Sequence, residues 1–150
     1  MIRATIYNAL LTQIQGIRDA PYNLAVPVIE LGLENAANNT KQPGLYVVPT
    51  KESSEYVRGL PLKWRLDVDV YLFTKKTPVG PGVYNALPVM DALELVLAPT
   101  KTSPTTGAYI NDLGLTGVVH HCAIKGSSEF FGGYLDQQTI VRIPIEILTA

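Results

Sequence analysis

The chain has 150 residues, a formal net charge of −1 and one cysteine. This length suits a single domain whose core is large enough to fold without disulfide bridges, and one cysteine excludes a disulfide within the chain. The near-zero charge argues against nucleic acid or an anionic membrane as a partner. No apolar run reaches the ~20 residues of a membrane-spanning helix, and the chain opens on an amphipathic pattern rather than a secretory signal. We expect one soluble domain over residues 1–150, made in a cytoplasm.

The first third of the chain predicts a helix and two short strands. Apolar residues recur at spacings of three and four on one helical face: Ile2, Ile6, Leu10, Ile14 and Ile17. Strand patterns follow at Pro27–Leu33 and Leu45–Pro49, separated by a turn-rich loop at Asn35–Gly44. Thr50–Gly59 predicts an exposed, mobile connection, because it contains four charged residues: Lys51, Glu52, Glu55 and Arg58.

The clearest pattern is Leu62–Phe73, where apolar residues fill the even positions. Charged residues fill the odd positions up to Asp69, namely Lys63, Arg65, Asp67 and Asp69. Side chains alternate faces along a strand, so this segment predicts one strand of about twice the usual length. We expect its apolar face to pack on helices, with Trp64 as the largest contributor and Trp64→Ala costing about 3–5 kcal/mol. The charged face is expected to meet solvent or a second copy.

A second amphipathic helix follows a Pro- and Gly-containing loop at Lys75–Gly82. Its apolar stripe comprises Val83, Leu87, Met90, Leu93 and Leu97, with Ala86 and Val96 widening it. Pro88 is compatible with a helix that begins near Leu87, because proline is tolerated in the first turn. Pro99–Gly114 is rich in Thr, Pro, Gly and Ser, which predicts a long surface excursion.

Two strands and a glycine-bearing loop complete the chain. Leu115–Ile124 and Thr139–Leu148 are the strands, and Gly126–Asp136 is the loop. Pro144 cannot donate to a ladder, so the last strand lies at an edge or turns the proline nitrogen away from its neighbour. Together the elements predict an α+β fold, a mostly antiparallel sheet with two amphipathic helices packed on one face.

Residues with potential chemistry are few. His120-His121-Cys122 invites a metal reading, but adjacent strand residues face opposite ways and no neighbour completes a tetrahedral set. We interpret the segment as a central strand with one buried and one exposed histidine. A Cys–His nucleophile is disfavoured, because a thiol on a regular strand is poorly placed for attack and protease signatures are missing.

Two further patterns are weighed as sites. Asp67 and Asp69 share a strand face ~6–7 Å apart, a separation found between glycosidase carboxylates. Lys63 and Arg65 share that face, which favours ion pairing across strands or a subunit contact. Neither Gly114-Leu115-Thr116-Gly117 nor Gly132-Gly133 matches a phosphate-loop pattern. We therefore expect no catalytic residues, no metal and no cofactor.

The loop Gly126–Asp136 is the third candidate contact surface. It contains Phe130, Phe131 and Tyr134, which would be poor surface for an isolated monomer. The aromatic side chains either fold back to cap the sheet or dock on a neighbouring subunit or partner.

The whole layout resembles the small neck and tail-completion proteins of tailed phages, especially tail terminators. The resemblance rests on four elements covering nearly all of the chain: the helix at Ile2–Ile17, the Leu-Lys-Trp-Arg-Leu-Asp-Val-Asp-Val-Tyr strand, the helix at Val83–Leu97, and the closing Ile-Val-Arg-Ile-Pro-Ile-Glu-Ile-Leu strand. It implies a structural virion protein of the tail or neck, assembled in the host bacterial cytoplasm. Members of the family form rings, usually hexameric, that cap the tail tube, end its polymerisation and present the surface that joins the head.

The resemblance also implies partners and leaves alternatives open. The partners are further copies of the chain, the tail tube protein and neck or connector proteins, with no membrane and no sequence-specific nucleic acid. Thr50–Gly59 and Pro99–Gly114 become candidate contacts to tube, sheath or neck, and the family supplies no catalytic residues. Two related interpretations stay open: a head-completion or connector protein of the same neck, and a tail-tube protein. A small enzyme or ligand-binding domain, with its site near residues 126–136, is the alternative of another class.

Overall fold

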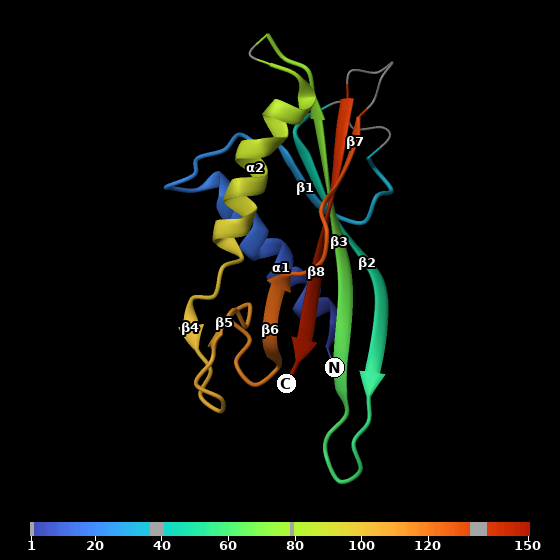
Figure 1. The fold of residues 1–150 in the computed structure, drawn as a ribbon, viewed down its shortest axis with the longest axis vertical. Helices are drawn as coiled ribbons and strands as arrows, with labels where there is room; N and C mark the ends of the chain where they lie inside the picture. Colours follow the sequence, from blue (N-terminus) through green and yellow to red (C-terminus); the bar gives the residue numbers. More distant parts are fainter. Residues whose placement is uncertain (1, 37–40, 79, 133–137) are drawn as a thin grey trace.

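The computed structural model describes residues 2–36, 41–78, 80–132 and 138–150. Within them the chain forms two α-helices, a short 3-10 helix and eight strands (Figure 1). These are α1 (Arg3–Gln15), η1 (Gly16–Arg18), β1 (Val28–Leu31), β2 (Gly44–Glu55), β3 (Lys63–Lys75), α2 (Gly82–Val96), β4 (Lys101–Thr102), β5 (Tyr109–Ile110), β6 (Val119–Ile124), β7 (Glu129–Gly132) and β8 (Gln138–Thr149).

Six of the strands form one sheet in the order β1-β2-β3-β8-β6, and β7 also pairs with β8. β1 runs parallel to β2, and the other pairs in this sheet are antiparallel. Both helices lie on the same side of the sheet (Figure 1). The α+β prediction, with a mostly antiparallel sheet covered on one face, is confirmed.

The core lies between this face of the sheet and the two helices. In β8 every second side chain is buried, and β3 alternates in the same way from Leu66 to Thr74 except that Asp69 is also buried. The central buried set comprises Leu66, Val68, Val70 and Leu72 of β3, Val141, Ile143, Ile145 and Ile147 of β8, and Ile6, Leu10 and Ile14 of α1. Each of these side chains stabilises the fold by about 1.5–3 kcal/mol through burial, before the loss of conformational entropy.

Helix α2 agrees with the predicted Val83–Leu97 segment to within one residue, but not with the face expected to be buried. Because it begins at Gly82, the alternative start near Leu87 is wrong and Pro88 lies inside the helix. A Cβ at Gly82 would lie 2.8 Å from Oγ1 of Thr139, and the Thr74 hydroxyl donates to the Gly82 carbonyl at 2.6 Å. This close approach fixes the rotation of the helix. Small side chains therefore face the sheet (Ala86, Val89 and Ala92, with Leu93), whereas Val83 and Leu87 are exposed.

The predicted mobile connection at Thr50–Gly59 is wrong in its first half. β2 continues to Glu55, because Lys51 to Glu55 pair with Asp67 to Lys63 of β3 after an irregularity at Pro49. Residues 56–62 alone connect the two strands, and they project beyond the rest of the sheet (Figure 1). Leu62 belongs to this connection and is exposed, so the long strand begins one residue later than predicted.

Pro144 lies in an interior strand, and its environment explains why proline is accepted there. β8 pairs with β3 along one side, and with β7 and then β6 along the other. The Lys125 N–H donates to the Pro144 carbonyl at 3.0 Å, beyond the end of β6. Since N and C=O of one strand residue point the same way, the proline nitrogen faces the gap between β7 and β6. The second of the two predicted alternatives is correct.

The last predicted excursion, Pro99–Gly114, is partly buried. It contains the β4–β5 hairpin, and its end covers the outer edge of β6, where the Cys122 N–H donates to the Asn111 carbonyl at 2.7 Å. The Asn111 side chain exchanges hydrogen bonds with Gln13 of α1 at 2.8 and 3.1 Å and donates to the Leu97 carbonyl at 3.3 Å. Asn111 thus ties both helices to the sheet edge. The strand predicted at Leu115–Ile124 begins only at Val119.

Candidate functional site

The charged side of the long strand β3 lies on the sheet face opposite the helices, which we call the open face. Arg65, Asp67 and Asp69 lie on this face, in register with Leu148, Glu146 and Pro144 of β8. Arg142 donates from Nε to Asp69 Oδ2 at 2.8 Å and from Nη1 to Glu129 Oε1 at 2.7 Å. The predicted ion pairing across strands is therefore present.

A second ion-paired group lies further along the open face. Arg65 Nε is 3.2 Å from Glu146 Oε2, and Lys125 Nζ is 3.0 Å from Glu146 Oε1. Two cations and one carboxylate form this group, whereas two carboxylates and one cation form the Arg142 group. Adding the two groups gives three cations and three carboxylates, so the charges within the two ion-paired groups cancel.

The burial of Asp69 contradicts the expectation that the whole charged face meets solvent. Its side chain is buried, and the residue is 6% exposed. The hydrogen bond from Arg142 to Asp69 also raises the pKa of Arg142 above its usual value. Arg142 occupies Oδ2 of this buried carboxylate, so Asp67 and Asp69 do not face solvent as two free carboxylates, the arrangement weighed from the sequence.

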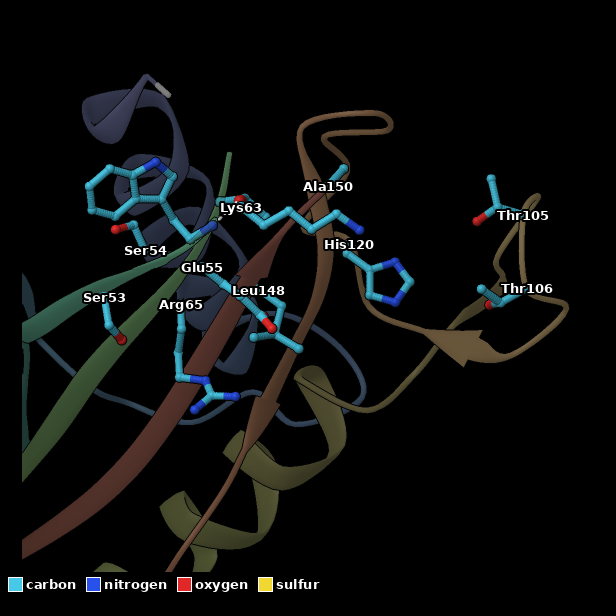
Figure 2. A pocket seen from close by; sticks show the side chains of 12 residues that line it. Ser53, Ser54, Glu55, Lys63, Arg65, Thr105, Thr106, His120, Leu148 and Ala150 are labelled. Carbon is cyan, nitrogen blue, oxygen red and sulfur yellow. Dashed lines mark hydrogen bonds between the residues drawn. The ribbon is translucent and has the colours of Figure 1, made fainter. Parts of the chain in front are cut away.

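A groove of about 730 Å³ opens at the end of the sheet where the β2–β3 connection begins (Figure 2). Glu55, Lys63 and Arg65 line it from the β2–β3 strands, and Thr105 and Thr106 line it from the β4–β5 connection. The remaining lining residues are Ser53, Ser54, Trp64, His120, Leu148, Thr149 and Ala150. The size is ordinary for a small-molecule site. The lining offers hydroxyls and mixed charges, with no cysteine beside the histidine.

Trp64 lines this groove instead of forming the centre of the core. It is half-buried, and the Arg3 guanidinium lies 5.5 Å from the centroid of its ring. Arg3 also contacts Glu52 of β2, with Nε at 2.8 Å from Oε2, and the Tyr7 hydroxyl donates to Glu52 Oε1 at 2.9 Å. The bond from Arg3 lowers the pKa of Glu52, and burial raises the pKa of Tyr7. Glu52, predicted as a partner contact, instead anchors α1 to β2.

The other predicted charged contacts lie in different places. Lys51 is exposed on β2, Glu55 lines the groove, and Arg58 lies within the β2–β3 connection, at its turn. The sequence reasoning missed the apolar neighbours of Arg58. Tyr56, Val57, Leu60 and Leu62 are between 47% and 74% exposed. The signal was present as the run Tyr-Val-Arg-Gly-Leu-Pro-Leu in a segment expected to be polar.

The aromatic segment is a strand in its described part. Phe130 and Phe131 belong to β7, which pairs with β8, and they are 49% and 48% exposed. Neighbouring strand residues point to opposite faces, so the two rings do not form one cluster. The prediction that both cap the sheet is wrong, and docking on a partner stays a prediction. Tyr134 lies outside the described residues.

The His120-His121-Cys122 segment lies on β6, whose outer side borders the Asn111 segment and not another strand of this sheet. The interpretation as a central strand is therefore wrong, and both histidines are half-buried rather than one buried and one exposed. His121 Nδ1 accepts the Asn111 N–H at 3.1 Å, and burial lowers the pKa of His121. Cys122 faces the core, where burial raises the pKa of its thiol to about 12.

Among the described residues, no group of three or more His, Cys, Asp or Glu side chains lies close enough together to hold a metal ion. No helix in the described ranges has the length and apolar character needed to span a membrane.

Comparison with known proteins gives a likeness of structure. No family model matches the sequence, and no curated protein matches it either. Among solved structures, the chain is similar to one from the virion of a native gene transfer agent (GTA) particle. The two share 12% sequence identity and superpose with a TM-score of 0.57, covering 96% of each chain. At this identity the likeness shows a shared fold over the full length of both chains.

Proposed function

We propose that this chain is a structural virion protein of a tailed phage or phage-like particle, and that it forms a ring which caps the tail tube. The observation that carries the proposal is the fold shared with a GTA virion chain over 96% of both chains. It agrees with the layout of helices and strands that resembles tail terminators. In this role the ring ends tube polymerisation and presents the surface to which the head joins.

The surface chemistry supports a role in assembly over one in catalysis. Six charged side chains of the open face are held in ion pairs with one another, and Asp69 is paired with Arg142 and buried. The one thiol faces the core with a raised pKa, which makes it a poor nucleophile. In contrast, apolar side chains project into solvent at residues 56–62 and on α2. Exposed apolar patches of this kind mark protein contacts.

A ring places one further demand on the chain. Each copy must contact the next through two different surfaces, and the rotation between copies must close. The described structure offers distinct surfaces at different places: the projecting connection 56–62, the exposed side of α2, and the half-exposed aromatic residues of β7. In the proposed head-to-tail ring, two of these surfaces form the contacts with the two neighbouring copies.

The proposal is tested with a tail tube protein from the same phage or phage-like particle. Tube protein is allowed to polymerise with and without the purified chain, and tube lengths are measured by negative-stain electron microscopy. A terminator shortens the tubes in proportion to its concentration and appears as a density cap at one end. Unchanged lengths with no bound protein contradict the proposal. Binding to tube ends without any effect on length indicates a head-completion or connector protein instead.

A further inference from the structure

The segment 56–62 joins β2 to β3 and is defined here as the hairpin tip. Four of its seven residues are large, exposed apolar side chains, and its one charged residue is Arg58. The tip projects past the end of the sheet, away from both helices (Figure 1). Arg58 forms no ion pair within the part of the chain that the structure describes. The tip therefore presents an apolar surface with one unpaired positive charge.

A second groove, of about 380 Å³, is apolar like the hairpin tip but carries the opposite charge, and we call it the α2 groove. Leu87 and Met90 of α2 line it together with Ile124 and Ile143 of the sheet, so its lining is largely apolar. The remaining lining residues are Asp91, Glu94 and Ser128. Neither Asp91 nor Glu94 is paired with a cation among the described residues. The groove therefore offers an apolar floor and two uncompensated negative charges.

The two surfaces match in both respects, and they cannot meet within one copy. The hairpin tip lies at one end of the long axis, and α2 covers the other part of the sheet (Figure 1). We propose that the hairpin tip of one copy docks into the α2 groove of the next, with Leu60 on the apolar floor and Arg58 beside Asp91 and Glu94. This inference rests on the proposed ring-forming function and names the contact that would build the ring.

A contact between two different surfaces of the same chain has a definite consequence. Each copy uses its tip on one neighbour and its groove on the other, so assembly continues until a ring closes. A symmetric dimer is not expected, because tip does not match tip: two apolar tips would bring two Arg58 charges together. Buried apolar side chains provide the anchor, and the charge contact sets the register and excludes wrong partners.

The test uses cysteines at exposed positions, which leaves the core untouched. Leu60→Cys and Leu87→Cys are made singly and together, and a short thiol-specific bifunctional reagent is applied to the purified protein and to tails assembled with it. Cys122 gives a silent background, since it is buried. The double variant is expected to give a ladder of dimers, trimers and larger species on a denaturing gel. A mixture of the two single variants should give dimers alone, and each single variant should give none.

Charge reversal supplies an independent readout. Arg58→Glu is expected to lower ladder formation in the Leu60→Cys/Leu87→Cys background by about tenfold or more, because a desolvated charge pair becomes a repulsion. Adding Glu94→Arg should restore the ladder. Lys51→Glu, which changes an exposed cation on β2, the strand that leads into the tip, is the matched control and should have no effect. Circular dichroism melts verify that each variant is folded.

Two results overturn the proposal. One is absence of the ladder in both purified protein and assembled tails, and the other is equal cross-linking by Leu60→Cys alone. The outcome is separable from the proposed function. Control of tube length by a protein that gives no ladder would leave the terminator role intact and remove this interface. A ladder from a protein that leaves tube length unchanged would keep the interface and remove the terminator role.

Discussion

Replacing Asn111 with alanine is expected to destabilise the fold by about 2–6 kcal/mol, as worked from its two hydrogen bonds to buried backbone groups. The side chain is 2% exposed, accepts the Leu113 N–H at 3.1 Å and donates to the Leu97 carbonyl at 3.3 Å. Leu97 and Leu113 are both buried. Each backbone group that loses a buried partner costs about 1–3 kcal/mol. Gln13, the remaining partner, is half-exposed and can turn to water.

The matched control is Gln13→Ala, which removes the exposed half of the same interaction and keeps the two backbone bonds of Asn111. It should cost less than about 1 kcal/mol, the typical net value of a single hydrogen bond. Urea unfolding followed by circular dichroism gives both free energies, with equal slopes indicating a common two-state transition. If Asn111→Ala unfolds within about 0.5 kcal/mol of the natural sequence, or no more easily than Gln13→Ala, the assignment of Asn111 as the tie between helices and sheet edge is refuted.

Three further outcomes follow from single side chains. Lys101 Nζ lies 2.6 Å from Asp112 Oδ2, and its hydrogen bond lowers the pKa of Asp112, so this stabilisation is complete above an unfolded pKa of about 3.9 and is lost as pH falls below it. Asp112→Asn should therefore be less stable than the natural sequence at neutral pH and should lose less stability on acidification. Equal losses of stability in parallel urea melts would exclude the pairing. Trp64→Ala should cost about 1–3 kcal/mol, below the range expected from sequence, because the ring is half-buried beside Arg3; a urea-melt difference above that range would place the ring in the core. Cys122 should stay unreactive toward an aromatic disulfide reagent at pH 8 until the chain unfolds, given its burial and raised pKa, and rapid labelling of folded protein would contradict this.

Strictly alternating segments could be predicted from sequence, because a period of two is unique to strands. The boundaries of Leu62–Phe73 and Thr139–Leu148 agree with β3 and β8 to within two residues. The polar run that includes Lys51 to Glu55 carries no such pattern. It is a strand because β3 continues beside it and supplies the ladder, a tertiary effect that local propensity does not contain.

Helix α2 shows why a helical period alone does not determine which face is buried. Apolar residues lie on more than one side of it, and the largest of them suggested the stripe through Val83 and Leu87. The close contact of Gly82 with Thr139 turns the small residues toward the sheet instead. That contact joins positions 57 residues apart in the sequence, so the pattern of the helix alone does not predict which face is buried.

The candidate surfaces divide in the same way. The alternation correctly placed Arg65, Asp67 and Asp69 on one face, but the burial of Asp69 depends on Arg142, which is 73 residues away in the chain. Conversely, the charged residues of Thr50–Gly59 drew attention away from the apolar side chains of the hairpin tip. Their exposure follows from the length of the β2–β3 hairpin, which carries them beyond the reach of either helix.

The most direct test of the central claim is the length of tails in particles whose genome lacks this gene. Tail lengths are measured by electron microscopy, with the gene supplied in trans as the control. A tail terminator predicts tails of excessive and variable length that carry no heads, and normal tails when the gene is restored. Tails of normal length in the deletion strain would contradict the account.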